Sequence, residues 1–68
     1  MMHETMDSNV IKNRVEAGGA VDMKDGIEIV KVMIGRRFAA VEDDREFLHL
    51  FKNTWMISES SLAKFLNR

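Results

Sequence analysis

The carboxylates that could carry out acid–base chemistry form one acidic run, Glu42, Asp43, Asp44 and Glu46. General acid–base catalysis needs a carboxyl group that is perturbed by burial or by a close charged partner. This run instead stands where a helix is expected to begin, and helix capping accounts for acidic residues at such a place. We therefore predict no catalytic residue and expect a protein that is not an enzyme.

Nucleophiles and metal ligands are sparse in this chain. Ser58, Ser60 and Ser61 would need a base within hydrogen-bond reach, and only His49 could serve as that base. No nucleophile elbow or glycine-rich phosphate-binding motif surrounds them, and the chain contains no cysteine. The two histidines, His3 and His49, lie too far apart in sequence for zinc-ligand spacing. We expect neither a metal nor a cofactor.

A contrast of charge is the most informative feature of the sequence. Lys31, Arg36 and Arg37 precede the acidic run and have the opposite sign. Arg36 and Arg37 could pair with Asp43 and Asp44 of a second copy across a two-fold axis, or with an acidic partner protein. Such pairs set register and association rate more than affinity, and they predict an association that weakens with salt.

Length and composition favour a single folded unit that gains stability by association. We assign residues 1–6 to a flexible tail and residues 7–68 to one small domain. A chain of 68 residues buries only about 60% of its unfolded surface, so self-association would add needed stability. The net charge of −1 argues against general phosphate attraction. No apolar run reaches the roughly 18 residues of a membrane span, and we expect a cytoplasmic protein.

The middle of the chain reads most simply as a small sheet. Five of the eight residues 27–34 are β-branched, which suits a pleated surface. Residues 23–26 resemble a tight turn that ends in glycine, and a second turn at residues 35–36 would return the chain through residues 38–41. The alternative is one long helix with its apolar stripe at Ile27, Val30, Ile34, Phe38 and Val41, at a cost of roughly 1 kcal/mol for each interior glycine.

Helices are expected on both sides of this segment. The first would be capped by Asp7 or Ser8 and would end at residues 18–19, both glycine. The second would be capped by Asp43, with Glu46 reaching back, and the third by Ser58. Their apolar residues fall on single faces: Phe47, Leu48, Phe51 and Trp55 on one helix, then Leu62, Phe65 and Leu66 on the other. The predicted class is α+β: a short N-terminal helix, an antiparallel β-hairpin or three-stranded meander, and two C-terminal amphipathic helices. An all-α bundle is the alternative.

Residues 43–68 resemble the opening half of a DNA-binding helix-turn-helix unit. They offer one helix, a short link and a second helix that contains the sequence SSLAKFL. In such units the helix with the Leu-Ala pair would pack against a following recognition helix, and none follows here. Leu62 and Ala63 are equally expected in any packed amphipathic helix. The residues predicted to contact nucleic acid are Lys31, Arg36, Arg37, Lys64 and Arg68.

We expect a small protein-interaction module that acts as a regulator, adaptor or inhibitor through a homodimer or another protein. A DNA-binding transcriptional regulator is the alternative. Large aromatic residues dominate protein interfaces, so Trp55 is predicted to anchor either the core or a dimer contact. The predicted interaction residues are Arg36, Arg37, Asp43, Asp44, Phe47, Phe51 and Trp55.

Overall fold

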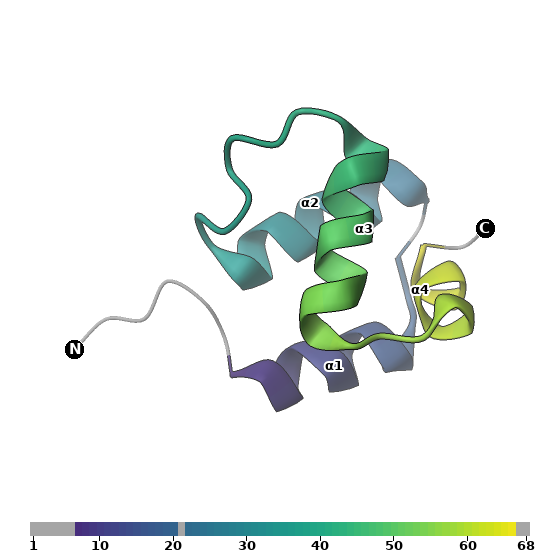
Figure 1. Ribbon diagram of the computed structural model, residues 1–68. Coiled ribbons are helices and arrows are strands. Elements are labelled where there is room, and N and C mark those ends of the chain that lie inside the picture. Colours follow the sequence, from purple (N-terminus) through teal and green to yellow (C-terminus); the bar gives the residue numbers. More distant parts are fainter. Residues whose placement is uncertain (1–6, 21, 67–68) are drawn as a thin grey trace.

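The computed structural model describes residues 7–20 and 22–66, and these form a small bundle of helices (Figure 1). The helices are α1 (Ser8–Ala17), α2 (Met23–Ile34), α3 (Asp44–Trp55) and α4 (Glu59–Phe65). Within the described residues the chain forms no strand, so the predicted α+β class is wrong and the all-α alternative holds. The predicted tail at residues 1–6 and the predicted contact residue Arg68 lie outside the described residues.

The helix α2 replaces the predicted β-hairpin. Residues 23–26 are its first turn, where the Asp22 side chain accepts a hydrogen bond from the Asp25 N–H at 2.8 Å. Ile27, Val30 and Ile34 recur at helical spacing and are buried together in the core. That burial outweighs the β preference of their branched side chains, because helices in proteins are held mostly by tertiary packing of one face.

The predicted return strand at residues 38–41 is a series of turns. Gly35 has a φ of 64° and ends α2. The N–H groups of Arg37, Ala39 and Val41 then donate to carbonyl oxygens three residues earlier, at 3.3, 3.1 and 2.9 Å. These bonds satisfy the backbone locally, so the connection needs no partner strand.

The predicted helix starts are confirmed where a side chain caps them. Asp7 accepts from the Asn9 N–H at 2.8 Å, and Asp43 accepts from the Arg45 N–H at 2.9 Å. Ser58 accepts from the Ser61 N–H at 3.1 Å. Each bond satisfies one of the backbone donors that a helix start leaves without a partner.

One core joins all four helices, with α1 packed against α3 and α4. Gly26 of α2 is buried at the contact with α4, where a Cβ would meet Leu66 and Phe65, so it serves close packing and not the predicted turn. The buried residues include those predicted for the faces of α3 and α4. They are Ile11, Val15, Ala20, Ile27, Val30, Met33, Ile34, Phe47, Leu48, Phe51, Trp55, Ile57, Leu62, Phe65 and Leu66.

The connection between α2 and α3 is tied to this core by an aromatic contact. Phe38 is half-buried, and its ring meets those of Phe47 and Trp55 edge to face, each with a centroid separation of 6.2 Å. Its φ of 61° is left-handed, a conformation that costs a residue with a Cβ about 1–2 kcal/mol. The aromatic contacts therefore hold Phe38 in a strained backbone conformation.

Replacement of Phe38 should separate the strain from the contacts. We expect Phe38→Ala to lower the free energy of unfolding by about 2 kcal/mol, because it loses both ring contacts and keeps the Cβ. Phe38→Gly should be at least as stable as Phe38→Ala, because glycine removes the left-handed strain. Urea unfolding followed by far-UV circular dichroism measures both variants.

The matched control is Ala40→Gly, an exposed neighbour in the same connection with no positive φ. Glycine should destabilise the chain there, because it adds conformational entropy to the unfolded state. If Phe38→Gly were clearly less stable than Phe38→Ala, the left-handed strain at Phe38 would be refuted.

Candidate functional site

An apolar groove opens between α1 and α2. It has a volume of ≈ 320 Å³ and is lined by Val10, Arg14, Ile29, Val32 and Met33. The guanidinium of Arg14 donates to the Gly18 carbonyl oxygen at 3.0 Å and lies 5.7 Å from the centre of the Phe65 ring. Because its charged end is engaged there, Arg14 offers mainly its aliphatic stem to the groove.

The groove exists because α2 is apolar on two sides. Ile27 and Val30 face the core, while Ile29 is half-buried and Val32 is 75% exposed. Val10 of α1, at 50% exposure, supplies the other wall. Among the described residues the exposed large hydrophobic side chains are Val10, Val32 and Met56, so two of the three gather at one place. Large contiguous apolar patches mark interaction surfaces, whereas single exposed apolar residues are ordinary. Val10 and Val32 together make this groove a candidate contact surface.

The predicted aromatic interaction residues lie inside the chain's own core. Phe47, Phe51 and Trp55 have exposures of 2%, 0% and 6%. Phe51 and Trp55 contact each other with ring centroids 5.2 Å apart. These three side chains therefore present almost no surface to a partner in this conformation.

The four predicted charged interaction residues have different surroundings. Arg37 lies over the Trp55 ring, 5.4 Å from its centre, and Asp43 caps α3. Asp44 begins α3, and Arg36 is exposed just beyond the end of α2. Within the described part of the chain none of these four residues forms an ion pair.

The predicted nucleic-acid contacts do not come together on one element. Lys31 is on α2, where it lies 4.0 Å from a Glu28 oxygen and 5.6 Å from the centre of the Phe47 ring. Lys64 is exposed on α4, and the two predicted arginines lie in the connection that follows α2. The described members of this set thus come from α2, from the connection that follows it and from α4.

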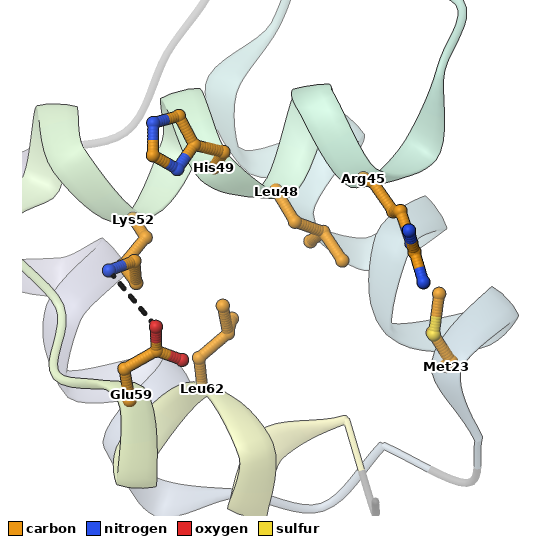
Figure 2. Close-up of a pocket in the computed structure, with 7 residues that line it drawn as sticks. All are labelled: Met23, Arg45, Leu48, His49, Lys52, Glu59 and Leu62. Atoms are coloured by element: carbon orange, nitrogen blue, oxygen red, sulfur yellow. Dashed lines mark ion pairs between the residues drawn. The ribbon is translucent and has the colours of Figure 1, made fainter.

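A second hollow, of ≈ 310 Å³, lies beside α3 and α4 (Figure 2). Lys52 and Glu59 face each other across it at 3.3 Å, and Arg45 extends toward Met23. His49, which also lines it, is bonded to Asn53 at 3.1 Å. Polar side chains of α3 therefore border a cleft. Its full lining is Met23, Arg45, Leu48, His49, Lys52, Glu59 and Leu62.

The chemistry available in this cleft is electrostatic. Lys52 and Glu59 neutralise each other, so Arg45 contributes the remaining full charge. Ser58, which caps α4, forms a hydrogen bond with Ser61 of that helix, with their Oγ atoms 2.9 Å apart.

Over residues 7–20 and 22–66, no three side chains of His, Cys, Asp or Glu are grouped to hold a metal ion. In the same ranges no helix is long and apolar enough to cross a membrane.

The connection between α3 and α4 is short. Only residues 56–58 separate the two helices, and Met56 adopts the left-handed conformation with a φ of 56°. The next residue, Ile57, is buried in the core. A short turn of this kind joins the two helices of a complete unit, in which the second helix is the one that reads DNA. α3 and α4 share such a short connection, and the resemblance of residues 43–68 to a helix-turn-helix unit stays a prediction.

Sequence reasoning missed Val10, Ile29 and Val32 as surface residues. The β-branched pattern suggests a strand for Ile29 and Val32, and Val10 falls near the same predicted face as Ile11. A helical interpretation of residues 23–34 would have revealed the second apolar side, since Ile29 and Val32 fall away from the Ile27–Val30–Ile34 stripe.

Comparisons of this chain with protein-family models, with curated proteins and with solved structures gave no match. Two surface features remain as candidates for function. They are the groove between α1 and α2 and the pair formed by α3 and α4.

Proposed function

We propose that this protein is a non-enzymatic interaction module that works as a homodimer, with the α1–α2 groove as its contact surface. The observation that carries this proposal is the exposure of Val10 and Val32 on the two walls of one groove. As a regulator, adaptor or inhibitor, such a module would act by binding and not by turnover.

Burial of this surface would supply the driving force. Moving a valine side chain fully out of water stabilises by roughly 1.5 kcal/mol or more. A two-fold contact uses the same patch on both copies, so each residue contributes twice. Association costs on the order of 4 kcal/mol or more in lost translational and rotational freedom. A few buried side chains on each copy are therefore enough for a weak dimer and not for a tight one.

A charge placed in the groove should abolish the association. We expect Val32→Lys to convert the dimer to a monomer, because two lysines would meet in an apolar contact. Folding should be retained, since Val32 is 75% exposed and a cation near the C-terminus of a helix is favourable. Light scattering over a range of protein concentrations gives the molar mass, and circular dichroism checks the helix content.

The matched control is Met56→Lys, which makes the same change at an 81% exposed apolar residue outside the groove. This control should keep the molar mass of the unmodified chain. A wild-type chain that stays monomeric up to millimolar concentration, or a Val32→Lys variant that stays dimeric, would rule out the groove as the contact.

A DNA-binding regulator is the second candidate, favoured by the turn at Met56 that gives α3 and α4 the order of a helix-turn-helix pair. The exposed side chains of α4 include Ser60 and Lys64, which are able to contact bases or phosphates. The exposed carboxylates of Asp44 and Glu59 lie on the same two helices and would repel the phosphate backbone. We rank this candidate second for that reason.

Lys64→Glu tests the DNA candidate directly. If α4 enters a duplex groove, this variant should weaken binding to random duplex DNA at least tenfold, because an attractive contact becomes repulsive. Fluorescence anisotropy at low salt measures the affinity, and Lys24→Glu, an exposed lysine on α2, is the matched control. Equal loss in both variants would indicate a general charge effect, and no binding by the wild type would eliminate the candidate.

A further inference from the structure

We infer that the two copies pair α2 against α2 in antiparallel orientation, and that Asp25 and Arg36 determine this register. The inference rests on the proposed homodimer and adds its geometry and its specificity-determining residues. The groove of one copy is then occupied by the outer side of α2 from a second copy of this chain.

The outer side of α2 has an ordered pattern along the chain. Asp25, Ile29, Val32 and Arg36 follow at intervals of four, three and four residues, which places the helical members on one face. Asp25 is in the first turn of α2, and Arg36 comes two residues after its last residue, Ile34. The pattern is acidic in the first turn of α2 and apolar in its centre, and the basic Arg36 follows just after Gly35, where the helix has ended.

This pattern is complementary to itself only when one copy is reversed. In the antiparallel arrangement Ile29 of one copy meets Val32 of the other, and Asp25 meets Arg36 at both ends. In a parallel arrangement like charges would meet, Asp25 with Asp25 and Arg36 with Arg36. Antiparallel pairing also brings the positive start of one helix beside the negative end of the other, which is favourable.

Asp25 and Arg36 are available for such contacts. Both are exposed, and in the part of the chain that the structure describes neither forms an ion pair. The neighbouring pair on α2, Glu28 and Lys31, is already joined at 4.0 Å. Asp25 and Arg36, which the antiparallel arrangement pairs, are therefore among the charged residues on α2 and at its end that have no ion-pair partner in the described part of the chain.

The proposed partner of Arg36 is Asp25, whereas the sequence predicted Asp43 and Asp44. Asp43 is engaged as the cap of α3, and Asp44 lies on α3, beyond the connection of residues 35–43. Arg37 lies over Trp55 and away from the α2 pattern. Asp25 shares the outer side of α2 with Ile29 and Val32, and it is not paired within the helix as Glu28 is with Lys31.

Mixing two charge-reversal variants provides the test. Asp25→Arg alone and Arg36→Asp alone should each weaken the homodimer about tenfold or more, because two attractive exposed pairs become repulsive. In a mixture of the two variants, the introduced arginine of one chain faces the introduced aspartate of the other. At the opposite end of the contact the unchanged Arg36 faces the unchanged Asp25, so a heterodimer with wild-type affinity should form. Native mass spectrometry counts homodimers and heterodimers in the mixture, and sedimentation equilibrium gives their dissociation constants.

Two control variants test whether the loss of affinity is specific to Asp25 and Arg36. Arg37→Asp and Asp44→Arg make the same reversals at exposed neighbours and should leave the dissociation constant unchanged, with circular dichroism confirming the fold of every variant. If Asp25→Arg disturbs the start of α2, Asp25→Asn gives the smaller loss expected when attraction is removed without repulsion.

Two results would overturn the inference. One is a mixture of Asp25→Arg and Arg36→Asp that stays as weak as its components. The other is an Asp44→Arg variant that is weak alone and restored by Arg36→Asp. In either case a Val32→Lys variant that is still monomeric would leave the proposed homodimer intact, whereas a Val32→Lys dimer would remove the proposed function as well.

Discussion

The structure depends on the fact that α2 has more apolar side chains than one core can bury. Its inner residues, Ile27, Val30 and Ile34, hold the bundle together, and Gly26 allows α4 to approach closely. Its outer residues, Ile29 and Val32, remain beside α1 and form the groove. On this outer side Val32 stays 75% exposed, and a second copy of the chain is the complement that we propose for it.

The placement of the groove leaves the other end of the bundle open. Val10 and Val32 lie in the first half of α1 and the last half of α2, which occupy the same side of Figure 1. The helix α4 lies on the opposite side, and its Lys64 is beside Gly18 at the end of α1. A dimer that covers the groove would therefore leave both copies of α4 accessible. The two candidate functions use different surfaces and are compatible in one molecule.

The sequence predicted the features that residues close together in the chain determine, namely helix caps and the apolar faces of two helices. The caps at Asp7, Asp43 and Ser58, and the apolar faces of α3 and α4, depend on residues close in sequence. The helical structure of α2 was not predicted, because β-branched residues on two sides of a helix resemble the alternation of a strand. The contacts of Phe38 with Phe47 and Trp55 were not predicted, because a left-handed backbone has no signature at a residue other than glycine. Arg36 was predicted to contact a partner, whereas Asp25 is proposed as its complement only because α2 is a helix.

In the homodimer that we propose, the outer side of α2 contacts the same side of α2 in a second copy. Isotope-filtered NOE spectroscopy tests it on an equimolar mixture of chains with ¹³C-labelled isoleucine and valine methyl groups and unlabelled chains. An antiparallel α2 pair should give cross-peaks between copies that join the methyl groups of Ile29 and Val32. Cross-peaks between copies that arise only from other residues, in a sample with the molar mass of a dimer, would contradict it.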